Sequence, residues 1–243
     1  MPTQPVTTDE PGTAGTGDRS TPRAAAAYDQ IADWYERVFL VGQRSEGQDP
    51  LGLRRALRDL LGPGTGICLD IGCGTGIHAG PVRELGWTPV GFDLSGGMLH
   101  YARDRLPAAR ADAERLPVRD GSVPAVLAMM VHTDMPGYPA VLREAARVLR
   151  PGGMLVHIGV HPCFCGGFAD RGDPDAVVIG PGYLDGHWTT ESWTDRGVRA
   201  RVGAVHRPLP DLMHAFGAAG LTLERFTEGG APTPTVLAVR ARR

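Results

Sequence analysis

The sequence predicts an α/β fold built on a parallel β-sheet, and three observations support that prediction. A short apolar run at 67–69 is followed by a glycine-rich turn and then by a helical pattern over 77–85. A second apolar run, 88–92, follows that helix and ends at an acidic residue. A third run, 123–131, is apolar on both faces, as expected of a central strand that helices cover on both sides.

The glycine-rich turn after the first strand has the features of a ligand site. Gly72, Gly74 and Gly76 stand at alternate positions, where glycine lets the backbone turn tightly and approach a bound molecule. A dinucleotide fold requires G-x-G-x-x-G, and the place of its third glycine is taken here by Ile77. Asp70 precedes the turn and would repel a phosphate but attract the ammonium group of an amino acid. Pyrophosphate binding is therefore disfavoured.

A second acidic residue narrows the choice of ligand. Asp93 closes the run 88–92, at a strand end where its carboxylate can accept hydrogen bonds from both hydroxyls of a ribose. A ribose together with a cationic amino acid describes S-adenosylmethionine. We therefore expect this compound as the cofactor.

Four segments of the chain resemble motifs of the class I S-adenosylmethionine-dependent methyltransferases. They are LDIGCGTG at 69–76, GFDLSGGML at 91–99, ADAERLPVRDGSV at 111–123 and VLREAARVLRPGGMLV at 141–156. The resemblance is to the small-molecule branch that includes the ubiquinone and menaquinone methyltransferases. It implies a seven-stranded Rossmann-like sheet with the last strand antiparallel, within a methyltransferase domain over 62–243.

The resemblance also implies roles for residues near the later strand ends. Leu94 and Met98 would contact the adenosine. Asp112 would accept a hydrogen bond from the adenine amino group, and the backbone N–H of Ala113 would meet a ring nitrogen. Met130, at the end of the fourth strand, completes the expected cofactor-binding residues. The alternative for Asp112 is a cap of a helix or turn.

Periodicity and capping residues predict the remaining elements. Asp49 is the expected N-cap of a helix with Pro50 in its first turn, and Ser95 is the expected N-cap of another. Pro124 leaves the start of the fourth strand open, because proline suits only the first residue or the edge of a strand. The other expected strands are 109–111, 154–160, 221–228 and 235–241, with helices over 139–149 and 208–219.

The N-terminal region precedes the sheet. Residues 1–22 are polar and rich in Thr, Pro and Gly, so we expect a disordered tail there. Over 23–61 we expect a helical lid, in which Tyr28 and Tyr35 share one helix face. The run YDQIADWY resembles the lid segment of the same methyltransferase branch, which implies that Tyr28 lies near the methionine end of the cofactor and Tyr35 near the acceptor. Alternatively, both rings only dock the helix on the core.

The composition limits the classes of binding partner that we expect. The chain of 243 residues has 25 basic and 27 acidic side chains, and a net charge of −2 provides no overall positive field for nucleic acid. No apolar run of about eighteen residues and no signal-peptide pattern occurs. We expect a cytoplasmic protein with a small-molecule acceptor as partner, and neither nucleic acid nor a membrane. A homodimer is left open.

The four cysteines favour reduced thiols over a metal site. Cys68, Cys73, Cys163 and Cys165 form no C-x-x-C pair of the kind that structural zinc prefers, so we expect no metal.

The segment 161–207 lacks strong periodicity and is expected to be an insertion after the fifth strand. Long aromatic-bearing segments inside a compact domain are often lids or binding elements. We assign Phe164 and Trp188, together with Tyr35, to the acceptor pocket. The rival interpretation is a surface excursion whose aromatic residues form a small core of their own.

Methyl transfer to a phenol, alcohol or protonated amine benefits from a base that removes the proton. The candidates are His132 and His161, which follow the fourth and fifth strands, and His206, which lies just before a helix. Asp134 could orient His132 or point into solvent. His78 could approach the methionine carboxylate.

The function predicted from the sequence is methyl transfer from S-adenosylmethionine to an oxygen or nitrogen of a small molecule, in secondary metabolism. Two alternatives stay open: a protein that binds the cofactor without transferring its methyl group, and a cofactor-assisted cyclase. A dinucleotide oxidoreductase is disfavoured by the position of Ile77.

Overall fold

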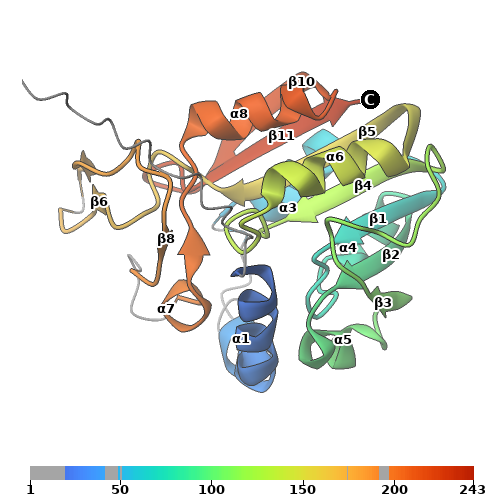
Figure 1. Cartoon of the computed structure of the whole chain (residues 1–243), viewed down its shortest axis with the longest axis horizontal. Coiled ribbons are helices and arrows are strands. Elements are labelled where there is room, and N and C mark those ends of the chain that lie inside the picture. Colours follow the sequence, from blue (N-terminus) through green and yellow to red (C-terminus); the bar gives the residue numbers. More distant parts are fainter. Residues whose placement is uncertain (1–19, 42–48, 50, 174, 192–196) are drawn as a thin grey trace, which may run out of the picture.

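A seven-stranded sheet forms the centre of the computed structural model, which describes residues 20–41, 49, 51–173, 175–191 and 197–243 (Figure 1). The strand order is β10-β11-β5-β4-β1-β2-β3, and β11 runs antiparallel to both of its neighbours. The predicted fold class is therefore confirmed. The strands are β1 Ile67–Ile71, β2 Thr88–Asp93, β3 Ala108–Arg110, β4 Val123–Met129, β5 Leu149–Val160, β10 Thr222–Gly229 and β11 Val236–Arg242.

Helices cover both faces of the sheet because the central strands are apolar on both faces. In β1, Leu69 and Ile71 belong to one core cluster while Cys68 belongs to the other. The first cluster is closed by α6 (Tyr138–Val148) and α8 (Leu209–Ala218). The second is closed by α3 (Leu53–Leu61) and by Val82 of α4 (Ala79–Glu84).

The N-terminal helix stands apart from these two layers. Figure 1 shows α1 (Ser20–Trp34) below the sheet, between α7 (Arg199–Val202) and α5 (Gly96–Ala102). It continues into η1 (Tyr35–Phe39), a π-helical turn. Of the tail predicted over 1–22, residues 1–19 lie outside the described residues and residues 20–22 belong to α1, which corrects that boundary.

The segment after β5 forms two small antiparallel pairs rather than further strands of the main sheet. β6 (Ala169–Asp170) pairs with β7 (Val178–Ile179), and β8 (Trp188–Thr189) pairs with β9 (Ala204–Val205). The chain then enters α8 and returns to the sheet.

Two predicted element starts differ from the structure. Helix α3 begins at Leu53 after Gly52, whose φ is 70°, so Asp49 is not its N-cap residue. The Asp49 carboxylate nevertheless accepts a hydrogen bond from the Arg55 N–H at 3.1 Å, which satisfies one of the free donors of that helix. Pro50 lies outside the described residues. In β4, the pairing with β5 shifts register around Pro124, which has no N–H to donate.

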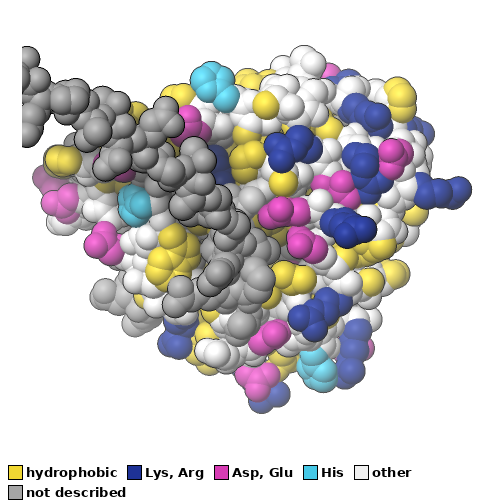
Figure 2. All heavy atoms as spheres, viewed as in Figure 1, with side chains coloured by type: hydrophobic (Ala, Val, Ile, Leu, Met, Phe, Trp, Pro, Cys, Tyr) yellow, Lys and Arg dark blue, Asp and Glu magenta, His cyan; other side chains and the backbone are white. Residues whose placement is uncertain are grey.

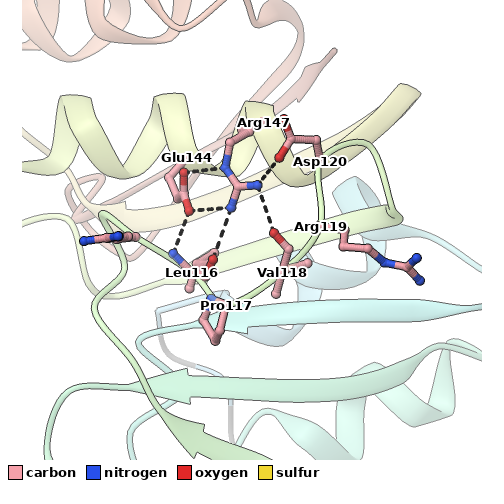
Figure 3. A pocket seen from close by; sticks show the side chains of 8 residues that line it. Leu116, Pro117, Val118, Arg119, Asp120, Glu144 and Arg147 are labelled. Atoms are coloured by element: carbon pink, nitrogen blue, oxygen red, sulfur yellow. Dashed lines mark hydrogen bonds and ion pairs between the residues drawn. The ribbon is translucent and has the colours of Figure 1, made fainter.

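Two of the four motif segments are joined by one arginine (Figure 3). Arg147 of α6 donates to Glu144 at 2.7 Å and to the carbonyl oxygens of Val118 at 2.9 Å and Leu116 at 3.1 Å. It also pairs with Asp120. Glu144 in turn accepts from the Leu116 N–H at 2.6 Å. The loop between β3 and β4 is thereby fixed to α6.

On the face drawn in Figure 2, basic and acidic side chains of the described residues are interspersed. Among the described residues, no helix is both long enough and apolar enough to span a bilayer. All four cysteines carry free thiols.

Candidate active site

The turn after β1 is shaped by its glycines. Gly72 has a φ of 67° and its N–H donates to the Phe92 carbonyl oxygen at 2.7 Å, which ties the turn to the end of β2. Gly74 has a φ of 53°, and a Cβ added there would meet no atom within 4 Å. The backbone at Gly74 therefore borders open space, as a close approach to a ligand requires.

Asp93 at the end of β2 is held rigidly by two backbone donors. Its Oδ2 accepts from the Gly74 N–H at 2.8 Å, and its Oδ1 accepts from the Ser95 N–H at 2.8 Å. Burial raises the pKa of Asp93, while these N–H groups act in the opposite direction. Ser95 is the N-cap of α5, as predicted, and its hydroxyl accepts from the Met98 N–H at 3.1 Å.

Asp70 lies beneath the turn and is 2% exposed. Among the described residues its Oδ2 has no hydrogen-bond partner. Burial, with a further contribution from Asp93, raises the pKa of Asp70 to about 7. A buried carboxylate oxygen without a partner is costly, and a cation beside it would stabilise the ionised form.

A cavity of about 400 Å³ opens beside this turn. Its wall is shared between the ends of β1, β2 and β4, the lid formed by α1 and η1, and residues 197–204. Ten of the seventeen residues predicted for the site line this cavity. Those that line it are Tyr28, Tyr35, Gly72, Gly74, Asp93, Leu94, Met98, Asp112, Ala113 and Met130. Asp70 lies beneath the turn instead. Gly76 packs against Leu106, so glycine is required there by its φ of 75° and by close packing, not by contact with the cavity.

Acidic side chains fix α1 and η1 beside the cavity. Asp29 accepts from the Ser95 hydroxyl at 2.6 Å and from the Gly97 N–H at 2.9 Å, which joins α1 to the start of α5. Glu36, which is 8% exposed, pairs with Arg105 at 2.5 Å. Arg105 also donates to the Thr75 carbonyl oxygen at 2.7 Å, so one side chain connects the lid to the glycine turn.

Asp134 of the β4 end and Tyr28 of the lid meet inside the cavity. The Tyr28 hydroxyl donates to Asp134 Oδ2 at 3.0 Å. Burial raises the pKa of Asp134 to about 7, against the opposing effects of the Tyr28 hydrogen bond and of the Arg199 charge. Arg199 lines the same cavity from α7. Asp134 therefore neither orients His132 nor points into solvent.

The three histidines predicted as candidate bases do not line the cavity, which corrects that part of the prediction. His132 is 2% exposed and packs in the core, with its ring 4.9 Å from that of His157. The His161 Nε2 donates to Glu228 at 2.8 Å, because its Nδ1 accepts from the Cys163 N–H. The His206 Nε2 donates to the Tyr183 carbonyl oxygen at 2.6 Å.

Of the other predicted residues, His78 lines the cavity, whereas Phe164 and Trp188 do not. Burial, with a smaller effect from Arg54, lowers the pKa of His78 to about 4, so the ring is neutral. The Trp188 ring covers Gly203, a residue of the cavity wall, and thus backs the wall from outside. Phe164 stacks near His161, with ring centroids 4.7 Å apart.

Sequence reasoning missed several residues of the wall. Arg199 and Val198 belong to an insertion without periodicity, so no pattern could have singled them out. Asp134 could have been identified from the sequence, since it follows a predicted central strand whose carboxyl end faces the ligand crevice. Met130 has a φ of 58°, uncommon for a residue with a side chain and typical of functional sites.

Comparison with known proteins agrees with this geometry. A family of methyltransferase domains matches residues 69–157, a span that begins within β1 and ends within β5. A solved S-adenosylmethionine-dependent methyltransferase from Mesorhizobium loti superposes with a TM-score of 0.63 at 26% identity, over 78% of this chain and 96% of that one. Over residues 69–157 and in its fold, the chain is therefore similar to S-adenosylmethionine-dependent methyltransferases.

The curated relatives that the chain resembles have names that state different acceptors. The demethylmenaquinone methyltransferase of Mycobacterium sp. (strain KMS) is 36% identical over 141 residues, which cover 57% of this chain and 60% of that protein. The malonyl-[acyl-carrier protein] O-methyltransferase of Serratia marcescens is 33% identical over 135 residues, or 54% and 50% of the two chains. The matched region thus spans 60% and 50% of the length of these two relatives.

Within the described part of the chain, no three His, Cys, Asp or Glu side chains come together to hold a metal ion.

Proposed function

We propose that this protein is an S-adenosylmethionine-dependent methyltransferase that acts on an oxygen or nitrogen of a small-molecule acceptor, in secondary metabolism. The observation that carries the proposal is the single cavity, which the glycine turn and Asp93 wall on one side and the lid and residues 197–204 on the other. Such a cavity can hold a cofactor and an acceptor in contact with one another.

Three features of the site fit S-adenosylmethionine. Gly74 leaves open space where any side chain would stand. Asp93 presents a fixed carboxylate beside that space, suited to the two hydroxyls of a ribose. Asp70 has a buried carboxylate oxygen without a partner among the described residues, which fits a nearby ammonium group. When bound, the cofactor supplies an electrophilic methyl group on a sulfonium.

Other cavity residues would hold the rest of the cofactor. Leu94 and Met98 offer apolar contact to the adenosine, and Asp112 with the Ala113 N–H would recognise the adenine edge. Neutral His78 can donate a hydrogen bond to a carboxylate.

The lid contributes by orienting the acceptor and excluding water. Tyr28 and Tyr35 are both half-buried and line the cavity, with their ring centroids 6.4 Å apart. Holding two reactants in position can supply about 7–11 kcal/mol of the barrier, more than a single side chain provides. The stated acceptors of the relatives differ, so we expect the acceptor to be selected by the lid and residues 197–204 of this chain. The cytoplasmic location and the homodimer stay predictions.

The test is calorimetric titration of the full chain with S-adenosylhomocysteine. Asp93→Ala removes a charged acceptor, and hydrogen bonds to a charged group contribute about 1.5–3 kcal/mol each, so we expect the affinity to fall about tenfold or more. Asp104→Ala, which removes an exposed carboxylate outside the cavity, is the matched control. Equal affinity in wild type and Asp93→Ala, or tighter binding of NAD than of S-adenosylhomocysteine, would contradict the proposal.

A further inference from the structure

One half-buried acid and one half-buried cation share the end of the cavity that the lid, the β4 end and residues 197–204 form. Asp134 comes from the β4 end and Arg199 from α7. The cavity wall also carries the hydroxyls of Tyr28, Tyr35 and Thr133, and apolar side chains that include Phe39, Val160, Val198 and Ala204. An acceptor bound there meets an apolar wall and two opposite charges.

Asp134 is placed to exchange a proton. Its Oδ2 accepts from the Tyr28 hydroxyl at 3.0 Å, which fixes the direction of the carboxyl group. The charged or titratable groups that act on it are Tyr28, Arg199 and Asp93, while its own charge raises the pKa of Tyr35. Burial brings the pKa of Asp134 to about 7, so the group can take up a proton near neutral pH.

The pair of charges discriminates between acceptor classes. An amine acceptor arrives as a cation and would be repelled by Arg199. A carboxylate acceptor would be repelled by Asp134 and has no proton to give to it. A hydroxyl is neutral when it binds, so it can donate a hydrogen bond to Asp134. Its oxygen becomes negative when it loses the proton, and the positive charge of Arg199 then stabilises it.

We propose that the acceptor is an apolar molecule with an acidic hydroxyl of the phenol or enol type, that Asp134 accepts its proton, and that Arg199 stabilises the oxygen that becomes negative. This inference rests on the proposed function. The hydroxyl oxygen forms a bond to the methyl carbon as the carbon–sulfur bond breaks and its electron pair passes to sulfur. The products are a methyl ether and S-adenosylhomocysteine, and the proton on Asp134 returns to solvent.

The first experiment compares three acceptors that share one ring system. The full chain is incubated with S-adenosylmethionine and 2-naphthol, 2-(aminomethyl)naphthalene or 2-naphthoic acid, and S-adenosylhomocysteine is quantified by mass spectrometry. We expect product from 2-naphthol in clear excess over the other two. Preference for the amine or the acid, or no product from 2-naphthol, would overturn the inference.

The second experiment assigns the roles. Asp134→Asn keeps an acceptor for the Tyr28 hydroxyl but cannot take a proton, so kcat with 2-naphthol should fall about 10²–10⁴-fold. The loss should be smaller with 6-cyano-2-naphthol, a stronger acid that needs less help to ionise. Arg199→Met should lower kcat about 10²-fold with both naphthols, because the developing charge loses its counter-charge. Arg143→Met, an exposed change of equal charge on α6, should match the wild type.

The outcomes separate the two levels of the proposal. Calorimetry with S-adenosylhomocysteine is run on every variant. If the wild type does not bind this compound, the proposed function fails. If it binds normally but Asp134→Asn loses the same factor with both naphthols, or loses nothing, the role of Asp134 as proton acceptor fails while the proposed function stands.

Discussion

Two glycines of the same turn illustrate how a single position serves either the ligand or the fold. Gly72 and Gly74 both have positive φ, so alanine at either position costs backbone strain of about 1–2 kcal/mol. A Cβ at Gly72 would lie 2.7 Å from the Val131 side chain and 2.9 Å from Met135, whereas at Gly74 it would enter open space. The two positions therefore differ in what surrounds them and not in their backbone conformation.

Alanine substitutions separate these two roles. Gly72→Ala should lower the free energy of unfolding by more than Gly74→Ala, because it adds overpacking to the strain. Gly74→Ala should instead weaken S-adenosylhomocysteine binding the more strongly, since its methyl group occupies ligand space. Urea unfolding and calorimetry on the same preparations measure both effects. The opposite ranking in either measurement would mean that Gly74 does not border the ligand.

At the same scale, the sequence identified the cofactor side of the site better than the acceptor side. The roles of Gly74 and Asp93 depend on a local strand, turn and helix, which the pattern of residue types reveals. The choice of His132 failed for a reason that no pattern discloses: the left-handed backbone at Met130 turns the chain, and His132 then enters the core beside His157. Arg199 reaches the cavity only through the path of the insertion.

Among the elements, the loop between β3 and β4 depends on α6 through Arg147 (Figure 3). Arg147→Met should lower the free energy of unfolding by about 2–3 kcal/mol, because two carbonyl oxygens and the largely buried Glu144 lose a charged donor. The neighbouring Arg143→Met, exposed on the same helix, should change it by less than about 0.5 kcal/mol. Urea denaturation at neutral pH measures both, and equal effects would show that the network does not stabilise the fold.

Element boundaries were predictable where a cap or a proline determines them locally. Ser95 caps α5 as expected, and Pro124 coincides with the register shift in β4. Helix α3 begins later than its sequence suggests because Gly52 adopts a left-handed conformation, and Asp49 then reaches the helix from outside it. Asp49 was thus correctly predicted to interact with the start of this helix, but its position as the N-cap residue was wrong.

At the scale of the whole molecule, two buried histidines make stability depend on pH. The His157 Nδ1 accepts from the Tyr138 hydroxyl at 2.6 Å, and His132 packs against both rings. Burial, followed by the charge of Arg207, lowers the pKa of His157 to about 3, and burial also lowers the pKa of His132. Both rings stay neutral in the folded chain, while the unfolded chain binds protons below pH of about 6.5.

The sign of the effect follows from linkage. Below about pH 6.5 the unfolded state binds more protons than the folded state, so each such histidine lowers the free energy of unfolding by about 1.4 kcal/mol per pH unit as the pH falls. Asp70 and Asp134 act in the opposite sense, because their raised pKa values let the folded state hold protons between about pH 4 and 7.

His157→Gln isolates the histidine contribution, since it keeps an acceptor for the Tyr138 hydroxyl and does not titrate. Its free energy of unfolding should fall less steeply than that of the wild type between pH 6.5 and 4, with the two curves approaching each other by about 1.4 kcal/mol per unit. Urea denaturation across this range measures both curves. Parallel curves would mean that His157 is protonated in the folded protein.

The overall arrangement was predictable because alternating strands and helices leave few topologies open. The seven-stranded sheet and the antiparallel β11 agree with the expectation from the motif segments. The paths of β6 to β9 were not predictable, since these pairs are two residues long and lack the repeated apolar pattern from which longer elements are inferred.

The π-helical turn η1 has a consequence for how the lid could have arisen. A π-helical turn holds one residue more than the α-helical hydrogen-bond pattern requires, so it is equivalent to a single-residue insertion in a helix. Deleting one residue within Tyr35–Phe39 would therefore convert the π turn into an α turn and leave the residues on either side in register. Buried Leu40 would keep its place in the interior, so a lineage could gain or lose that codon without rebuilding the mouth of its cavity.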